Sequence, residues 1–317
     1  MRTRWRWVGG VLCGLAAACS GGDETSATTS TSTTTTTTGE STGEAPGCGD
    51  GIVQAGEACD DGDANADDAA CTADCTVNVC GDGKVGPGES CDAPGDPACT
   101  DDCRAVLFAD DAENGDGDWE HALVDDPGCD EITGYCAEDL WVRIADGIDG
   151  NPDPDSVRSW TSGDLSLVRG PMSSRLMTPE IDLSAAQAPV ILEFDHSVNF
   201  KDIGVVMPYS DGSVVELAVD GGDFGYVAMD GYTAAITDAG MCASLPDSPV
   251  NPLLGVTAFV GQYNGWSHEA VDLSAHVGAK IRLGFRVASD CAAADGPFEL
   301  PVVWYLDNVR VSAHTSP

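Results

Sequence analysis

The sequence predicts an all-β protein, in which a C-terminal two-sheet jelly-roll sandwich follows small disulfide-rich repeats and a disordered, threonine-rich tether. Three observations support this fold class. A cysteine pattern occurs twice between Cys48 and Cys103, short runs with a period of two follow from Ala105 onward, and no window has sustained helical periodicity. Many short strands divided by Gly, Asp and Pro are typical of a sandwich or jelly roll.

The composition excludes one class of partner. The 317 residues include 14 basic and 53 acidic side chains, which give a formal net charge of −39. Such a surface repels nucleic acid and anionic lipid head groups, and it attracts divalent cations. We therefore expect no nucleic-acid partner.

Residues 1–18 have the features of an export signal. Three arginines precede an apolar run of twelve residues, Trp7 to Ala18, and this run is shorter than the roughly 20 residues that span a membrane. The small residues before Cys19 resemble the lipobox of bacterial lipoproteins. That resemblance implies that Cys19 carries fatty chains such as palmitate and anchors the protein in the cell envelope. Ser20, directly after the lipid site, favours anchoring in the outer membrane, and both the cell surface and the periplasmic face are left as options. The alternative is an ordinary secretory signal without a lipid anchor.

Residues 19–47 predict a flexible tether. Between Asp23 and Pro46 the chain holds eleven threonines and four serines, with no aromatic or large aliphatic residue. Such a segment buries too little apolar surface to offset the entropy lost when its backbone becomes ordered.

Residues 48–104 contain two cysteine-rich repeats, 48–79 and 80–104, with a period of 32 residues. Each copy reads Cys-Gly-Asp-Gly, then Gly-Glu-x-Cys-Asp, then Cys-x-x-x-Cys. Between Cys48 and Cys103, fourteen acids, one base and five larger apolar side chains cannot form a hydrophobic core. Cross-links must therefore hold each unit, at about 3 kcal/mol for a loop of some 15 residues. Zinc is the rival use of the cysteines, but Cys-x-x-Cys pairs are absent and an exported chain meets an oxidising compartment.

Disulfides are therefore expected to use every cysteine outside the signal and the lipid site, six pairs in all. The twelve residues are Cys48, Cys59, Cys71, Cys75, Cys80, Cys91, Cys99, Cys103, Cys129, Cys136, Cys242 and Cys291.

The repeat motifs resemble a cysteine-rich repeat that is abundant in myxobacterial surface proteins, over about 56 residues. The second copy departs from that pattern, with Asp92-Ala-Pro-Gly where Asp-Asp-Gly-Asn is usual. If the repeats bind a ligand, we therefore expect the first copy to do so.

Residues 105–317 are predicted to form the sandwich. In Lys280–Val287, Ile281, Leu283, Phe285 and Val287 alternate with polar residues, which indicates a half-buried strand. Ser213–Asp220 has the same period and ends in a turn. Further strands are predicted at residues 105–109, 140–145, 159–162, 176–177, 190–196, 257–260, 268–273 and 302–311.

Landmarks between Leu107 and Ser312 resemble the jelly roll appended to secreted metalloproteases of the immune-inhibitor-A type, which is similar to MAM domains. They include Asp110-Asp-Ala-Glu113-Asn-Gly, Leu192-Glu-Phe-Asp-His196 and Trp304-Tyr-Leu-Asp307-Asn-Val309. The resemblance implies an accessory binding or stabilising domain whose structural calcium is held by Glu113 and Asp307. Pairing of the first and last strands would bring these two acids together.

Acid-rich loops offer two further candidate calcium sites, because this hard cation takes six to eight oxygen ligands. Asp61, Asp63 and Asn65 begin like an EF-hand, although the glycine and the bidentate glutamate of that motif are missing. They predict a calcium loop of another type, against a solvated acidic loop. The run Asp149-x-Asn151-x-Asp153-x-Asp155 is the second candidate.

Catalytic motifs are sparse. His268-Glu-Ala-Val-Asp272 lacks the second histidine of a zinc-protease motif and alternates as a strand, and His196 is in register with buried strand positions. No Gly-x-Ser-x-Gly elbow occurs. A carboxylate pair for glycoside hydrolysis stays an alternative among 53 acids.

The sequence thus predicts a non-catalytic envelope lipoprotein with an adhesion role, whose calcium-stabilised jelly roll binds an extracellular glycan or protein. A polysaccharide hydrolase and a purely structural envelope protein are the alternatives. The aromatics Trp160, Tyr209, Tyr232 and Tyr263 are candidates for stacking on sugars, against plain packing.

Overall fold

The computed structural model describes residues 47–124, 139, 141–145, 151–153, 155–163, 172–200, 209–237, 251–262, 265–289 and 303–315. The predicted signal, the lipid site, the tether and the last four predicted disulfide cysteines lie outside these residues. The chain divides into residues 1–45 and a unit of residues 46–317 that contains everything described below. In the described part, no helix is long and apolar enough to cross a membrane.

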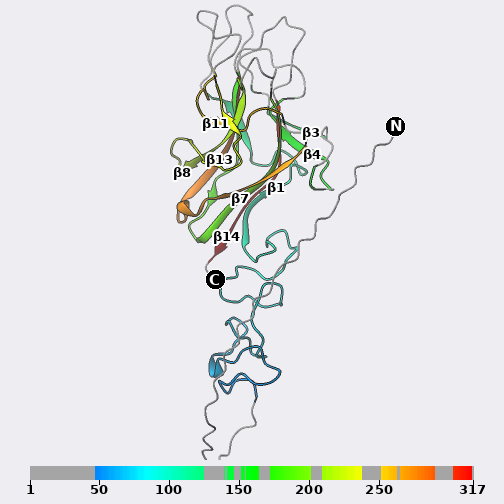
Figure 1. The fold of residues 1–317 in the computed structure, drawn as a ribbon, viewed down its shortest axis with the longest axis vertical. Coiled ribbons are helices and arrows are strands. Elements are labelled where there is room, and N and C mark those ends of the chain that lie inside the picture. Colours follow the sequence, from blue (N-terminus) through cyan, green and yellow to red (C-terminus); the bar gives the residue numbers. More distant parts are fainter. Residues whose placement is uncertain are drawn as a thin grey trace, which may run out of the picture. The chain divides into compact units, whose positions relative to one another are not determined.

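Two antiparallel sheets form a sandwich, which confirms the predicted all-β class (Figure 1). The first sheet has the order β12-β7-β14-β4-β3, with β1 also paired to β14, and the second has the order β2-β5-β13-β8-β9, with β6 paired to β13. The strands of the first sheet are β1 (Ala105–Asp110), β3 (Val142–Ala145), β4 (Arg158–Thr161), β7 (Ala186–Asn199), β12 (Ser267–Asp272) and β14 (Val303–Thr315). Those of the second are β2 (Glu120–Leu123), β5 (Met172–Met177), β6 (Ile181–Asp182), β8 (Gly212–Val219), β9 (Gly225–Tyr226) and β13 (Lys280–Ser289). A small pair, β10 (Ala234–Ala235) with β11 (Thr257–Ala258), and two single turns of 3-10 helix, η1 (Gly62–Ala64) and η3 (Ser274–His276), complete the described elements.

Alternation along the strands builds the core between the two sheets. Ile281, Leu283, Phe285 and Val287 of β13 are at most 1% exposed and join one cluster, as predicted. Aromatic rings from both sheets meet there, with Phe285 packed 5.7 Å from Trp304 between ring centroids.

The first and last strands of the sandwich pair with each other. In β1 and β14, Ala105 lies opposite Ala313 and Asp110 opposite Val309, as the jelly-roll prediction required. Every predicted strand has a counterpart in the structure, and β7 extends beyond its predicted range at both ends. The unpredicted strands β2, β6, β9 and β10 are two to four residues long, too short for a period to be recognised.

The two repeats share one cross-linking scheme. In each, the first cysteine pairs with the fourth and the second with the third, as Cys48–Cys75 with Cys59–Cys71 and as Cys80–Cys103 with Cys91–Cys99. The fourth cysteine of both copies has φ 56°, so the backbone makes the same unusual turn twice. The eight repeat cysteines thus form disulfides, as predicted.

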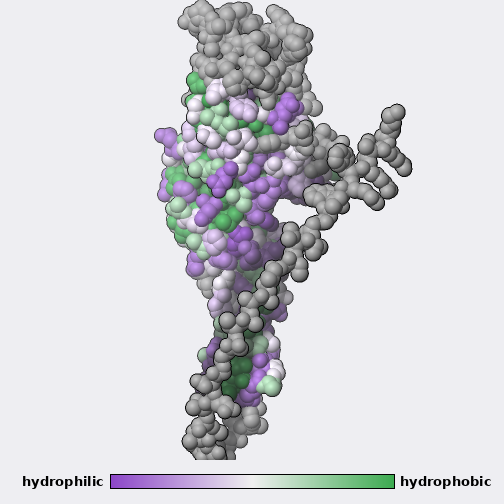
Figure 2. Space-filling view, in the orientation of Figure 1, coloured by the Kyte–Doolittle hydropathy of each residue, from purple (hydrophilic) through white to green (hydrophobic). Residues whose placement is uncertain are grey.

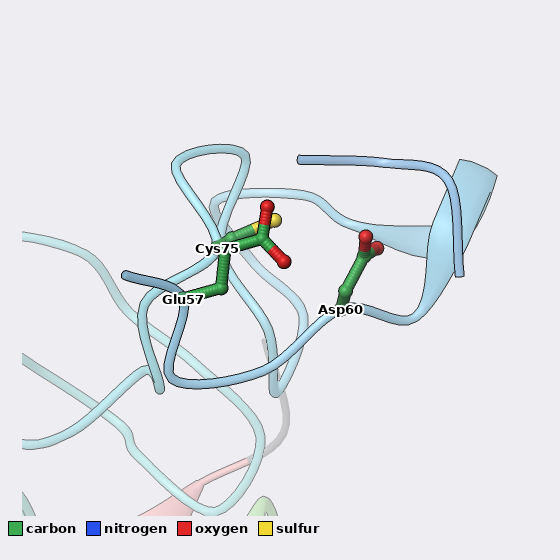
Figure 3. Close-up of side chains that lie close together, drawn as sticks. All are labelled: Glu57, Asp60 and Cys75. Atoms are coloured by element: carbon green, nitrogen blue, oxygen red, sulfur yellow. The ribbon is translucent and has the colours of Figure 1, made fainter. Parts of the chain in front are cut away.

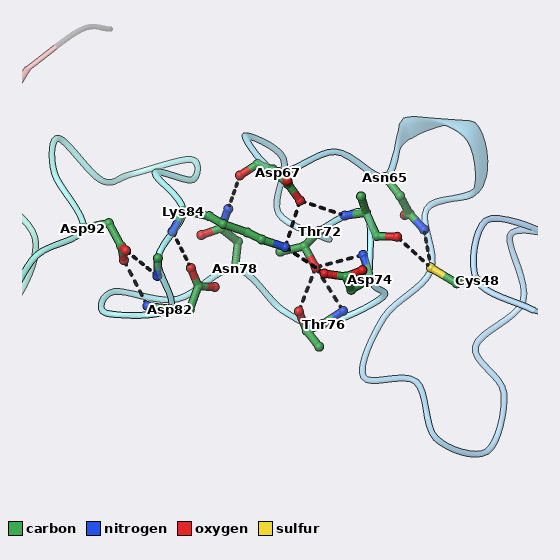
Figure 4. A network of polar contacts seen from close by, with 12 residues as sticks. Cys48, Asn65, Asp67, Thr72, Asp74, Thr76, Asn78, Asp82, Lys84 and Asp92 are labelled. Atoms are coloured by element: carbon green, nitrogen blue, oxygen red, sulfur yellow. Dashed lines mark hydrogen bonds and ion pairs between the residues drawn. The ribbon is translucent and has the colours of Figure 1, made fainter.

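The terminal hairpin of each repeat leads directly into the next unit. Cys71 and Val77 form an isolated antiparallel β-bridge just before the second repeat. Cys99 forms the same kind of backbone pairing with Ala105, the first residue of β1. Lys84 of the second repeat also reaches Asp67 and Asp74 of the first, at 2.8 and 3.2 Å (Figure 4).

Candidate functional site

Two of the calcium candidates predicted separately from the sequence converge on one segment, residues 151–158. Asp307 of β14 accepts hydrogen bonds through Oδ2 from the Asn151 amide and the Ser156 hydroxyl, both at 2.7 Å. Glu113, three residues beyond β1, accepts the backbone N–H groups of Val157 and Arg158 through Oε1, also at 2.7 Å. The pairing of β1 with β14 therefore lets both acids hold the same segment.

Asp307 is 1% exposed, and its hydrogen-bond donors are all uncharged. Burial raises the pKa of Asp307 to about 6, although hydrogen bonds from Asn151, Ser156 and the backbone of Asn308 act in the opposite direction. The nearby carboxylate of Asp195 adds to the rise. The site therefore holds a carboxylate that lacks a compensating positive charge among its described contacts.

The residues around Asp307 include oxygen ligands of the class that calcium takes, namely the two acids and the side chains of Asn151, Asp153 and Ser156. Asn151, however, turns its amide nitrogen toward Asp307, and its oxygen accepts the Asp153 N–H. Among the described residues, neither Glu113 nor Asp307 belongs to a group of three close acidic, histidine or cysteine ligands. Within the described residues, Glu113 makes hydrogen bonds through Oε1 alone, which leaves Oε2 for a ligand. Calcium at Glu113 and Asp307 stays a prediction, and a cation bound there would supply the missing positive charge.

The first repeat uses its acids differently from the predicted calcium loop. Asp61 and Asp63 are exposed, while the Asn65 side chain turns inward and donates to Asp60 at 3.0 Å and to the Cys75 sulfur at 3.1 Å. Glu57, Asp60 and Cys75 bring their ligand atoms within 4.8 Å of one another (Figure 3). Cys75 is a disulfide sulfur, however, and the thiolate is the form that binds metals.

Asp60 and its counterpart Asp92 organise the Cys-Gly-Asp-Gly turns. Asp60 accepts the backbone N–H groups of Gly49 and Asp50 through Oδ2, at 3.0 and 3.1 Å. Asp92 accepts the equivalent groups of the second repeat, at 2.6 and 3.1 Å, so this role survives the sequence departure there (Figure 4). Burial acts to raise the pKa of Asp60, but hydrogen bonds from Gly62, Gly49, Asn65 and Asp50 outweigh it and lower the pKa.

A pocket of about 420 Å³ lies on the outer face of the second sheet. Its floor comes from strand positions that alternate with core residues, namely Arg175 of β5, Glu216 of β8 and Arg286 of β13. The turn after β8, strand β9 and the residue that follows β2 supply the wall. The described residues that line the pocket are Val124, Arg175, Glu216, Gly222, Asp223, Phe224, Tyr226 and Arg286.

The charged floor of the pocket is held rigidly. Glu216 has a side chain only 2% exposed and lies between two guanidinium groups, Arg175 through Nε and Arg286 through Nη1. The Arg286 guanidinium also donates to the Ser173 hydroxyl, at 2.9 Å from Nη2. The Arg175 guanidinium lies 4.1 Å above the centre of the Phe224 ring, within the range of cation–π contact.

The aromatics predicted to contact sugars from loops serve packing where the structure describes them. Trp160 lies in β4 and is 2% exposed, and Tyr209 packs against a second buried cluster. Tyr232 packs 4.8 Å from Phe259, and burial raises its pKa. Tyr263 lies outside the described residues. The 50% exposed Tyr226, in the two-residue strand β9, was missed, because a lone tyrosine among turn residues carries no periodic signal.

The histidines are structural where the sequence expected it. His196 is fully buried, accepts the Trp304 indole N–H at 3.1 Å, and has its pKa lowered by desolvation. His268 lies in β12, a strand as predicted, and contacts Asp195 at 2.9 Å.

One serine, one histidine and one aspartate also meet at the edge of the second sheet. Asp139 stands between the other two, because it accepts the Ser174 hydroxyl and contacts His121 at 2.7 Å. A catalytic triad needs the histidine in the middle, so this order does not activate the serine.

No protein-family model matches the chain, and no curated protein matches it significantly. Among solved structures, the K3 adhesin domain of Lys-gingipain from Porphyromonas gingivalis W83 is 16% identical, with a TM-score of 0.33, over 65% of this chain and 98% of that one. A xylan-binding domain of carbohydrate-binding module family 22 is 9% identical, with a TM-score of 0.34, and the match covers 67% of this chain and 97% of that domain. The mannan-recognising module TmCBM27 is 12% identical, with a TM-score of 0.32, and the match covers 67% of this chain and 99% of that module. At these TM-scores the similarities support no inference, so ligand and activity must be argued from the residues of this chain.

Proposed function

We propose that the protein is a non-catalytic, envelope-anchored binding protein whose sandwich displays a glycan-binding face. The observation that carries the proposal is the pocket on the outer face of the second sheet, where an exposed tyrosine, a second aromatic ring and rigidly held charged side chains line one hollow. Its volume of about 420 Å³ falls in the range of small-molecule sites, roughly 300–1,000 Å³.

The chemistry of this pocket suits a sugar better than a peptide side chain or a lipid. Aromatic faces pack against the apolar C–H face of a sugar ring, while charged side chains exchange hydrogen bonds with its hydroxyl groups. Among the described residues that line the pocket, Val124 supplies the one aliphatic side chain. An occupant therefore needs many hydroxyl groups.

Glu216 supports a binding role over a hydrolytic one. A glycosidase needs one carboxyl group that releases a proton and a second carboxylate on the other side of the scissile bond. Glu216 instead is 1% exposed and forms ion pairs with two guanidinium groups, so both sides of its carboxylate are taken by the protein itself.

The proposal includes a lipid anchor at Cys19 and structural calcium at Glu113 and Asp307. The four disulfides of the repeats support export, because such bonds persist in oxidising compartments. A Cys19→Ser variant that still incorporates labelled palmitate would contradict the anchor.

A glycan array followed by calorimetry tests the binding role. The intact protein is expected to bind at least one oligosaccharide, and Tyr226→Ala is expected to weaken this binding by about tenfold through loss of the stacking ring. Val142→Ala is the matched control, because this exposed side chain lies in the other sheet. Release of reducing ends from a bound polysaccharide would instead establish the hydrolase alternative.

A further inference from the structure

The pocket on the second sheet has an inner layer that no ligand needs to touch. Arg286 is 4% exposed and Glu216 1% exposed, and Ser173, fully buried, accepts hydrogen bonds from the Nε and Nη2 atoms of Arg286. These three residues fix one another, and Glu216 in turn fixes Arg175 through its Nε atom. They are positioning residues for Arg175.

Arg175 presents its remaining donors to the pocket. Its side chain is 14% exposed, and among the described residues its hydrogen bonds use Nε alone, so the two terminal nitrogens Nη1 and Nη2 are left for a ligand. The guanidinium carbon lies 4.1 Å from the centroid of the Phe224 ring, and this cation–π contact helps to hold the group in place.

Gly284 of β13 makes room for this stack. A Cβ atom at Gly284 would lie 2.8 Å from the Arg175 Cδ and 3.0 Å from a Phe224 ring carbon, closer than normal packing allows. The absence of a side chain at this strand position therefore lets the arginine and the ring lie against the sheet.

Asp223 supplies an exposed acceptor at the rim of the same pocket, and Tyr226 supplies an exposed ring. A planar donor pair, a carboxylate acceptor and two aromatic rings match a sugar ring with adjacent hydroxyl groups. One hydroxyl accepts from Arg175, its neighbour donates to Asp223, and the C–H face packs on an aromatic ring.

The charges in the pocket bear on the choice between neutral and acidic sugars. Among the described lining residues, Arg175 and Arg286 carry two positive charges, and Glu216 and Asp223 carry two negative charges, which balance them. The chain as a whole has a net charge of −39, which repels polyanions. The carboxylate of an acidic sugar would pair with Arg175, but it would also meet the carboxylates of Asp223 and Glu216 in the same pocket.

We infer that the pocket takes a neutral sugar unit with adjacent hydroxyl groups, bound by Arg175, Asp223, Phe224 and Tyr226. This inference rests on the proposed glycan-binding function and specifies its ligand class.

The test compares neutral and acidic oligosaccharides on the full-length protein in calcium-containing buffer. Cellohexaose, mannohexaose and xylohexaose serve as neutral probes, and hexagalacturonate as the acidic probe, with Kd measured by calorimetry at low and physiological salt. We expect at least one neutral probe to bind with a Kd that salt leaves unchanged, since neither partner releases bound counter-ions. Asp223→Ala and Tyr226→Ala should each raise this Kd by about tenfold, while the exposed, distant Asp118→Ala should not.

Three outcomes would overturn the inference in distinguishable ways. Tighter, salt-sensitive binding of hexagalacturonate that Tyr226→Ala abolishes would refute the neutral class and keep the proposed function. Neutral binding that neither Asp223→Ala nor Tyr226→Ala weakens would refute the pocket as the site. Failure of every probe and of the glycan array would refute the proposed function itself. Melting curves of both variants separate lost contacts from lost folding.

Discussion

Asp307 is a buried carboxylate whose ionisation works against the fold unless a cation is bound. Below pH 3.8 the carboxyl group is protonated in the folded and the unfolded chain, so it has no effect on stability there. As the pH rises towards 6 the unfolded chain loses the proton first, which destabilises the folded state progressively. At neutral pH the loss reaches about 2–3 kcal/mol.

We therefore predict opposite effects of Asp307→Asn with and without calcium. In EDTA at pH 7 the variant should melt about 5–10 °C above the parent, because the buried charge is gone. In millimolar calcium the parent should gain stability and the variant should not. The melting temperature of the variant should then be equal to that of the parent or below it. The measurement is thermal unfolding by circular dichroism at pH 4 and pH 7, with Asp118→Asn as an exposed control. A parent melt that is the same in EDTA and in calcium would contradict the cation site.

Asp60 offers a second prediction at this scale. Its carboxylate accepts three backbone N–H groups and the Asn65 amide, whereas Asp63 is exposed. Asp60→Ala should speed hydrogen exchange at Gly49 and Asp50 by at least about tenfold, because those amides lose their acceptor. Asp63→Ala should leave both rates unchanged, and equal effects of the two variants would show that the turn does not depend on this carboxylate.

Single residues also mark the limit of sequence reasoning. Glu113, Asp307 and the acid-rich run around Asn151 were each recognisable as oxygen donors, but their convergence depends on the pairing of β1 with β14 and on contacts more than 150 residues apart in sequence. Conversely, Trp160 was a candidate for contact with sugars and is buried in β4, because a four-residue strand gives too few positions to decide which face is inside.

Strand β13 was predictable from its regular period. Its outer face shows what the period alone does not reveal. Gly284 interrupts neither the strand nor its pairing to β5 and β8. Its role becomes visible only when Arg175 and Phe224, from two other segments, are placed above it. A glycine within a strand often marks such a close approach.

Gly284→Ala should therefore disturb ligand binding more than folding. The added methyl group would push the Arg175 side chain and the Phe224 ring off the sheet, which separates the donor pair from the stacking ring. We expect about a tenfold loss of affinity for the neutral oligosaccharide with a small change in Tm. Ala218→Gly, at another outward position on neighbouring β8, serves as a control for altered strand backbone. Unchanged affinity in Gly284→Ala would argue that the stack is not part of the ligand site.

On the scale of the whole molecule, the repeats and the sandwich keep their structure by different means. The buried apolar residues of the repeats are Cys71, Cys75, Cys99 and Cys103, and all of the larger apolar side chains there are exposed (Figure 2). In the described part of the sandwich, 27 buried residues form one cluster, and none of these is a cysteine. The amino-acid composition predicted this difference between the repeats and the sandwich. The disulfide pairing within a repeat could not be predicted in the same way, because four cysteines allow three pairings and the folded turns select one of them.

Reduction of the disulfides should consequently open one part of the chain and spare the other. Without cross-links the repeats have no core to replace them, so their fourteen acids become accessible to an endoproteinase that cleaves after acidic residues. Peptides from β7, β13 and β14 should stay protected, because the apolar contacts between the two sheets do not depend on sulfur chemistry. Limited proteolysis with mass spectrometry measures the cleavage rates of the repeats and of the sandwich in one experiment. It is run in calcium-containing buffer, with and without a thiol reductant. If reduction accelerates cleavage equally in the repeats and in the sandwich, the sandwich also depends on cross-links. If the reduced repeats stay resistant to cleavage, their acid-capped turns are stable without disulfides.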